Sequence, residues 1–412
     1  MRRKELWRKA KDAAAPPEKG AKQYKYLYRR MLEEETIRKA YKNLRKGKTK
    51  RKEIQAIDAD LDNEVAAMRL MIENTKPPGV PVEHPELAFK PRKHTPKIIE
   101  EHGKRRKIYM PEIHEQWLHH IIVLVLEPII MATAYPYSCG SFPKRGGHYG
   151  KKQLLRWLKS GEGIRNFAKI DIRHFYDSIR LNILMRGLRI RIKDEWFLYF
   201  IQLCLQEFKK GIPLGFYISQ WLANYLLEPL DRFITEVLGL KKYERYMDDM
   251  VIFDNAKKKL HQAIIEIRKF IGRRFRLKLK NTYQVCKFHF VKRNRKVIGR
   301  ALDYMGFLFF RDRTTIRRRV MLAATRLARK MHKVREAMRG YFTKHIKAIL
   351  SYMGWFTHTD SYECYREHIK PYIIRLKRLK QIISKLDRRQ NHEAMDRGKK
   401  RAPAAGAAAC SA

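Results

Sequence analysis

The sequence predicts an α+β fold, with a small sheet set between long helical segments. Four stretches show the apolar alternation or composition that is typical of strands: 167–172, 243–253, 284–290 and 304–310. Helical spacing of apolar residues dominates the first 78 residues and residues 318–388. With helices before, between and after these strands, the sequence predicts a mixed fold of the α+β class.

The charge balance indicates a polyanionic partner. The 412 residues include 92 Lys and Arg but only 42 Asp and Glu, which gives a formal net charge of +50. Such an imbalance destabilises the compact state by self-repulsion, and a polyanion relieves it. Nucleic acid is the first candidate and an anionic membrane surface the second. The length predicts two or three domains, and 44% hydrophobic residues exclude a disordered chain.

Neither a membrane span nor secretion is expected. The longest apolar run, Ile121 to Leu126, ends at Glu127-Pro128 and is too short to cross a bilayer. The first residues, MRRKELWRKAKD, lack the apolar region of a signal peptide. Five scattered cysteines form no CxxC pair. These features predict a soluble protein of the reducing cytoplasm that makes no contact with a membrane.

Ahead of the first long strand, the sequence predicts charged helices, a basic hairpin, a buried helix and a glycine-rich loop. We expect them, in order, at residues 1–78, at strands near 88–89 and 107–109, at 112–134 and at 137–152, with a further helix from Lys151.

After that strand, helices are predicted between and beyond the remaining strands. They cover 184–208, 219–238, 260–270 and 318–388, the last broken near Gly340 and Gly354. The low-complexity tail at 391–412 is predicted to be disordered.

Carboxylates flanked by apolar residues are conspicuous in so basic a chain. Asp171 ends the strand FAKID, and Asp248 and Asp249 occupy the turn of YERYMDDMVIF. A carboxylate pair between two strands is costly unless a cation neutralises it. Mg²⁺ prefers oxygen ligands, and two such ions about 4 Å apart clamp the oxygens of a phosphoryl transfer. The alternative is a pair of ordinary turn aspartates and an unrelated Asp171.

Five segments together resemble the motifs of reverse transcriptases, in the order of that family. They are YSCGSFPKRGGHYGKK at 137–152, FAKIDIRHFYDSI at 167–179, GIPLGFYISQWLANYLLEPLD at 211–231, YMDD at 246–249 and LDYMGFLFF at 302–310. The resemblance covers about residues 85 to 312.

The resemblance implies a right-hand polymerase fold and an RNA-directed DNA polymerase that uses two Mg²⁺ ions. The implied divisions are a helical basic extension at 1–78, fingers at 79–165, a palm with an antiparallel sheet at 166–312 (with a finger insertion near 181–210), a helical thumb at 313–390 and the tail. The implied partners are an RNA template, a DNA or RNA primer, deoxynucleotides, a cognate structured RNA and an accessory protein.

The resemblance also assigns roles at the reacting centre. Asp171 and Asp248 are implied as catalytic metal ligands, with Asp249 completing the triad. Tyr176, five residues after Asp171, matches an aromatic gate that excludes a 2′-hydroxyl; the alternative is a core tyrosine. Arg106, with Lys104, matches the basic hairpin that grips the triphosphate; the alternative is a solvated loop that binds nucleic-acid backbone.

Further residues are implied in binding substrate and primer. Gly215 lacks a Cβ and lets backbone approach the nucleotide, and Gln220 follows it at the start of the long helix. Tyr304, Met305 and Gly306 match the primer grip; the alternative is a plain core hairpin. Lys278 and Lys280 stay open between a lysine that protonates pyrophosphate and contacts to the nucleic-acid backbone.

One motif departs from the common family pattern. The usual Gln-Gly-x-x-x-Ser-Pro is replaced by a segment with Leu214 before Gly215 and Gln220 after Ser219. This variant resembles enzymes of diversity-generating retroelements, where it accompanies error-prone copying, and some bacterial enzymes that act in antiviral defence. Both contexts stay open, and an RNA-binding protein without catalysis is a third alternative.

Overall fold

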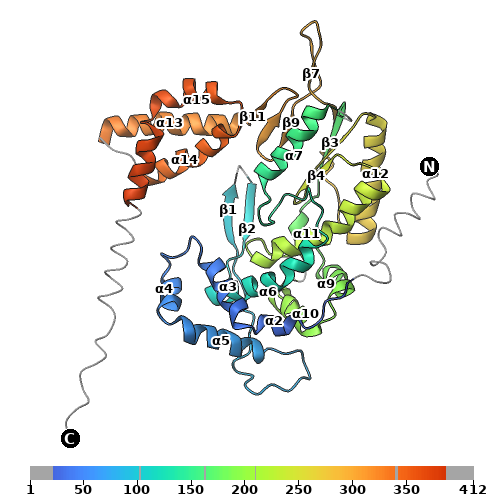
Figure 1. The fold of residues 1–412 in the computed structure, drawn as a ribbon, viewed down its shortest axis with the longest axis vertical. Coiled ribbons are helices and arrows are strands. Elements are labelled where there is room, and N and C mark those ends of the chain that lie inside the picture. Colours follow the sequence, from blue (N-terminus) through green and yellow to red (C-terminus); the bar gives the residue numbers. More distant parts are fainter. Residues whose placement is uncertain (1–21, 102–103, 162–163, 209, 339–341, 387–412) are drawn as a thin grey trace. The chain divides into compact units, whose positions relative to one another are not determined.

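The computed structural model describes residues 22–101, 104–161, 164–208, 210–338 and 342–386, which form two compact units (Figure 1). The first unit is Met1–Lys287 and the second is Phe288–Ala412. The predictions for the first 21 residues, for a break at Gly340 and for a disordered tail at 391–412 lie outside the described residues.

The N-terminal part of the first unit is helical. Its helices are α2 (Leu27–Met31), α3 (Glu34–Arg45), α4 (Lys52–Ala59) and α5 (Leu61–Glu73). In α3, Ile37, Tyr41 and Leu44 are buried at the i, i+4, i+7 spacing of a single helix face. That face packs on α6 (Ile113–Met131), where the indole N–H of Trp117 donates to the carbonyl of Ile37 at 2.9 Å.

A basic hairpin precedes α6. It consists of β1 (Lys97–Glu101) and β2 (Lys104–Ile108), paired antiparallel. The prediction of a strand near 88–89 was wrong. The Phe89 N–H donates to the Thr75 hydroxyl at 2.8 Å rather than to a ladder, and the pairing partner of β2 lies beyond Pro96.

A four-stranded antiparallel sheet forms the centre of the first unit. Its strand order is β4-β5-β3-β6, and the bounds are β3 (Asn166–Asp171), β4 (Tyr243–Tyr246), β5 (Asp249–Asp254) and β6 (Gln284–Lys287). The two central strands are apolar and largely buried, as expected for a sheet covered by helices.

Helices surround this sheet (Figure 1). They are α7 (Gly147–Ser160), α8 (Phe175–Ser178), α9 (Leu181–Arg191), α10 (Glu195–Leu205), α11 (Tyr217–Arg232) and α12 (Lys257–Phe275). α12 packs on β3, β5 and β6, and α11 packs on α6. The helix predicted at 219–238 is α-helical only to Arg232 and continues as one π-helical turn, Phe233–Val237.

The second unit joins short strands to helices. Its strands are β7 (Phe290–Val291), β8 (Val297–Ile298), β9 (Leu302–Tyr304), β10 (Phe307–Phe309) and β11 (Thr314–Ile316). The helical elements are α13 (Arg318–Met338), α14 (Thr343–Thr357), α15 (Tyr362–His368) and the 3₁₀ turn Lys370–Tyr372. The break predicted near Gly354 lies a few residues later, at 358–361, because α14 continues through Gly354 to Thr357.

The predicted α+β class and the antiparallel sheet are confirmed. None of the helices in the described ranges is both long and apolar enough to cross a membrane.

Candidate active site

The strand ends of the central sheet bring the predicted aspartates together. Asp171, the last residue of β3, lies directly opposite Asp249, the first residue of β5. Tyr246, the last residue of β4, faces Asp249 from the other side. Opposed residues of antiparallel strands project from the same face. Asp171 and Asp249 are therefore presented on one face, although 78 residues separate them.

A two-residue turn, Met247-Asp248, connects β4 to β5. Met247 has a left-handed backbone (φ 56°), and its side chain is buried against Gly140 of the glycine-rich loop. A Cβ at Gly140 would lie 2.6 Å from the Met247 Cγ and 2.9 Å from its backbone nitrogen. The glycine-rich loop therefore packs directly against the turn.

Asp248 is half-buried beside Asp171. Burial, followed by the charge of Asp171, raises the pKa of Asp248 to about 7. The Oδ1 atom of Asp171 is buried and accepts no hydrogen bond from any described residue. Two crowded carboxyl groups, one with an unused buried oxygen, form an environment that a cation stabilises.

Two lysines compensate these charges. The Lys280 ammonium pairs with Oδ2 of Asp171, and the Lys169 ammonium lies 3.4 Å from Oδ2 of Asp249. Lys280 is held in place by its backbone, since its N–H donates to the Asp171 carbonyl at 2.8 Å. Lys280, rather than Lys278, is therefore the lysine that contacts the carboxylate pair.

The carboxylates fit a divalent cation in part. Across the described parts of the chain, no three His, Cys, Asp or Glu side chains are grouped closely enough to hold a metal ion. Asp171 and Asp248 supply the oxygen ligands that Mg²⁺ prefers, and the buried Asp171 Oδ1 is available to such an ion. Asp249 reaches the same face but is engaged by Lys169.

A buried ion pair holds the turn onto α11. Arg245 and Asp231, both almost fully buried, form two charge-assisted hydrogen bonds of 2.7 and 2.6 Å. The same guanidinium donates to the Asn224 Oδ1 at 2.9 Å and to the Met247 carbonyl at 3.2 Å. The Tyr243 hydroxyl donates to Asp231 at 2.7 Å. Arg245 thus ties the backbone of the turn to two residues of α11.

The residue before Arg245 is buried without such compensation. Glu244 is fully buried, and neither of its carboxyl oxygens has a hydrogen-bond partner among the described residues. Burial raises its pKa to about 8. Glu244 is therefore predominantly protonated in the folded chain at neutral pH.

Tyr176 lies close to the carboxylates. It follows the strand end in α8, is half-buried, and feels the charge of Asp248, which together with burial raises its pKa. Its carbonyl accepts the Ile212 N–H at 2.9 Å, which joins α8 to the segment before α11. Tyr176 is thus placed between the end of β3 and the segment that leads into α11.

Position 215 requires a glycine because another segment of backbone lies against it. Its φ is +105°, and a Cβ would lie 2.1 Å from the carbonyl oxygen of Tyr109. The adjacent Leu214 carbonyl accepts the Tyr109 N–H at 2.7 Å. The close approach is therefore made by the end of the β1–β2 hairpin, which is joined to the start of α11.

The remaining predicted residues are more dispersed. Arg106 is exposed on β2. Lys104 begins the same strand, and the structure describes its backbone only. Gln220 is exposed in the first turn of α11, and its carbonyl accepts a 3.2 Å hydrogen bond from the Asn224 side chain.

The predicted primer grip lies in the second unit. Tyr304 is fully buried, and Met305 and Gly306 form the β9–β10 turn with φ of 49° and 88°. A Cβ at Gly306 would lie 2.4 Å from the Trp355 indole, so the turn packs directly against α14.

The residues that hold the turn were not predicted from the sequence. Arg245, Asp231 and Asn224 are distant in sequence, and no local spacing relates them. A partial signal is available in the polar Asn224 and Asp231, which stand seven residues apart on one face of the helix.

A match to a known protein family identifies the family of this chain. The family described as "Reverse transcriptase (RNA-dependent DNA polymerase)" matches residues 91–302, about half of the chain. The chain belongs to the reverse transcriptase family. The matched segment of this reverse transcriptase includes Asp171, Asp248 and Asp249 and ends just before the β9–β10 turn.

Individual relatives are distant from this reverse transcriptase. Protein YkfC of Escherichia coli is 24% identical over 160 residues, which cover 34% of this chain and 40% of YkfC. Telomerase from Candida tropicalis in its apo form is similar with a TM-score of 0.41 and 11% identity, covering 57% of this chain and 49% of that one. Telomerase from Candida albicans bound to a fragment of telomeric RNA has a TM-score of 0.40 and 10% identity, covering 67% and 57%.

Replacing Arg245 by Met should destabilise the reverse transcriptase strongly. The change leaves Asp231 buried with a single hydroxyl partner, which costs about 3–5 kcal/mol. Urea unfolding followed by circular dichroism measures this loss. Arg189→Met is the matched control, because the Arg189–Glu195 pair is exposed on both sides and should contribute less than about 1 kcal/mol. Equal losses of unfolding free energy in the two variants would contradict a stabilising role of the buried Arg245–Asp231 pair.

Replacing Gly215 by Ala should displace the β1–β2 hairpin from α11. The methyl group meets the Tyr109 carbonyl and adopts an unfavourable φ, at a cost of about 1–3 kcal/mol or more. A lower melting temperature and faster proteolysis within the hairpin are expected. Gly187→Ala is the control, since its Cβ would meet only a ring carbon at 3.8 Å. Unchanged proteolysis in Gly215→Ala would refute the contact.

Proposed function

We propose that this chain is an RNA-directed DNA polymerase whose reacting centre is formed by Asp171 and Asp248. The supporting observation is the crowding of these two carboxyl groups at the end of the central sheet, within the segment that matches the family. The reaction joins the 3′-hydroxyl of a primer to the α-phosphate of a deoxynucleotide and releases pyrophosphate. An RNA template and the primer are the nucleic-acid partners, and the net charge of +50 suits both.

Asp171 and Asp248 would hold the divalent ions, with Asp249 joining them once Lys169 is displaced. Two Mg²⁺ ions would supply charge neutralisation at the attacking and leaving oxygens. The chain's own contribution is positional. Arg245 holds the turn that carries Asp248, and the backbone of Lys280 holds the segment beside Asp171. Such fixed placement of charge is the main source of rate enhancement in phosphoryl transfer.

The other site residues complete the proposal. Tyr176 lies beneath the sugar of the incoming nucleotide, and Arg106 with Lys104 binds its triphosphate from the hairpin. Gly215 and Gln220 border the nucleotide at the start of α11. Tyr304, Met305 and Gly306 support the primer end.

Replacing Asp248 or Asp171 by Asn should abolish primer extension. The lost carboxylate removes several kcal/mol of charge stabilisation, which corresponds to about a thousandfold or more in rate. The assay is extension of a primer on a heteropolymeric RNA template with deoxynucleotides and Mg²⁺, using protein purified together with its bound RNA. Asp254→Asn, at the other end of β5, is the control and should retain activity. Extension by the Asp248 variant would refute the assignment.

Replacing Tyr176 by Ala should admit ribonucleotides. Removal of the ring opens space beside the 2′-position, and differences of this size alter discrimination by about 10- to 200-fold. Single-nucleotide incorporation of dNTP against rNTP measures the ratio. Tyr176→Phe keeps the ring and should keep the selectivity. A ratio unchanged in Tyr176→Ala, or equally reduced in both variants, would contradict the gate.

The variant motif around Leu214 supports a diversity-generating or phage-linked retroelement as the context. An apolar side chain in place of the usual Gln removes a hydrogen-bond restraint beside the nascent base pair, which loosens discrimination. A role in antiviral defence, with DNA made on a dedicated non-coding RNA and an accessory protein, is the second candidate. Sequencing the extension products separates them: errors concentrated at one template base support the first, and accurate copying favours the second.

A further inference from the structure

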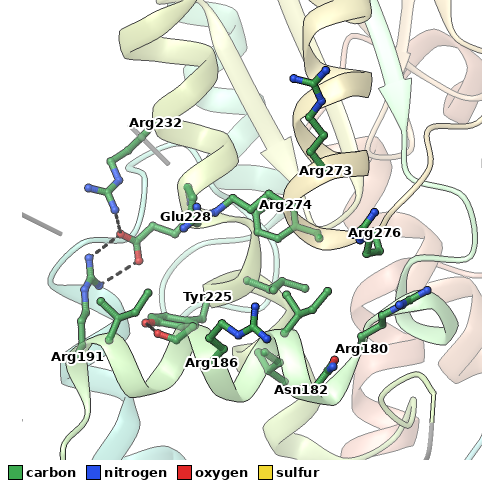
Figure 2. Close-up of a pocket in the computed structure, with 17 residues that line it drawn as sticks. Arg180, Asn182, Arg186, Arg191, Tyr225, Glu228, Arg232, Arg273, Arg274 and Arg276 are labelled. Atoms are coloured by element: carbon green, nitrogen blue, oxygen red, sulfur yellow. Dashed lines mark hydrogen bonds and ion pairs between the residues drawn. The ribbon is translucent and has the colours of Figure 1, made fainter. Parts of the chain in front are cut away.

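A cavity of about 710 Å³ lies between α9, α11 and α12 in the first unit (Figure 2). Its volume is in the range of small-molecule and nucleotide sites. None of the residues assigned above to the reacting centre lines it. Tyr225, Pro229 and Arg232 border it from α11, whereas Asn224 and Asp231 hold the catalytic turn from a face of that helix roughly 100° away. The cavity is therefore separate from the site described above.

Arginines from three helices converge on this cavity. Arg180 and Arg186 come from the start and middle of α9, and Arg273, Arg274 and Arg276 come from the end of α12 (Figure 2). Burial and the charge of Arg232 both lower the pKa of Arg274. Concentrated positive charge in a partly desolvated space is unfavourable, and an anion relieves it.

The residues that line the cavity carry far more positive than negative charge. Glu228 is the single carboxylate among the described residues that line the cavity. It accepts hydrogen bonds from Arg191 at 2.9 and 3.1 Å and lies 3.3 Å from Arg232. Seven arginines and one carboxylate thus stand among the described residues that line the cavity, which gives it an excess of positive charge.

The floor of the cavity is apolar. It includes Leu184, Leu226 and Phe275, which are buried, and the half-buried ring of Tyr225, whose hydroxyl donates to the Gly187 carbonyl at 2.9 Å. A small inorganic anion would leave this floor uncovered. A ligand that fits carries several negative charges in a short space and also a flat or apolar part. Nucleotides have both features, and guanidinium groups bind their phosphates in bidentate fashion.

We propose that this cavity, which we call the arginine pocket, binds the phosphates of a nucleotide while the sugar and base lie on the apolar floor. The nucleotide is either a unit of a single-stranded RNA or a free nucleoside triphosphate. The pocket is independent of nucleotide transfer at Asp171 and Asp248. Its function is to hold a strand or a nucleotide away from the reacting centre.

Photocrosslinking of the full chain tests the arginine pocket. One arm uses a 12-nucleotide RNA that carries 4-thiouridine, and the other uses 8-azido-ATP. The crosslinked peptides are identified by mass spectrometry. Crosslinks are expected on α9 or on the end of α12, around Arg273 to Arg276. Crosslinks in the RNA arm identify a strand as the ligand, and crosslinks in the azido-ATP arm alone identify a free nucleotide.

The test variant is Arg180→Ala/Arg186→Ala, in which both side chains are exposed and folding should be unaffected. The control is Arg189→Ala/Lys193→Ala, which removes the same charge from the same region without touching the pocket. The test variant should lose the crosslinks at the pocket, and the control should retain them. If RNA is the ligand, the slope of log affinity against log salt should also fall by roughly 1.4 in the test variant alone, at about 0.7 per phosphate contact.

Two results would overturn the proposal. One is the absence of crosslinks on α9 and the end of α12 in both arms. The other is an equal loss in the test and control variants, which would mean that general charge rather than the pocket binds the probe. Neither result depends on primer extension, so failure of the pocket and failure of the polymerase assignment are distinguishable.

Discussion

The buried pair of Arg245 and Asp231 fixes the position of the turn on which the candidate active site depends. The turn has only two residues, and its apolar residue, Met247, must occupy a left-handed conformation while its neighbour Asp248 is placed beside another carboxylate. Neither is favourable in isolation. The guanidinium offsets them by holding the Met247 carbonyl and two side chains of α11 at once. Loss of either partner would leave an uncompensated buried charge, so the pair opposes any rearrangement of the turn.

Close backbone contacts between distant segments also support the candidate site. Gly140 lies under Met247, Gly215 lies against Tyr109, and the Lys280 N–H bonds to the Asp171 carbonyl. Each contact brings together segments that are far apart in the chain, and two of the three require the absence of a side chain. The candidate site is therefore built on backbone contacts, to which the side chains of Lys280 and Lys169 add ion pairs with Asp171 and Asp249.

Much of the fold was predictable because it follows from local patterns. The alternation of apolar and polar residues at 167–172 and 243–253 predicted the central strands, and the order of the motifs indicated the family. The strand near 88–89 was wrong, and the break near Gly354 lies a few residues later, for a common reason. Both were inferred from local composition, whereas pairing across the β1–β2 hairpin and packing along α14 decide them. The clamp of Arg245 and Asp231 was missed because a lone charged residue in a strand shows its partner only once the chain has folded. The arginine pocket was likewise hidden, since its members lie in separate helices and resemble ordinary basic surface residues.

The buried carboxyl group of Glu244 couples folding of this chain to protons. Its pKa is about 8 in the folded state against an ordinary value near 4.5, so between these limits the folded protein binds a proton that the unfolded chain has released. Stability contributed by this group is complete at acidic pH and declines as the pH rises through neutrality toward 8. At the pH of most cells the chain therefore takes up a proton as it folds, at a residue adjacent to the arginine that holds the turn of the candidate active site.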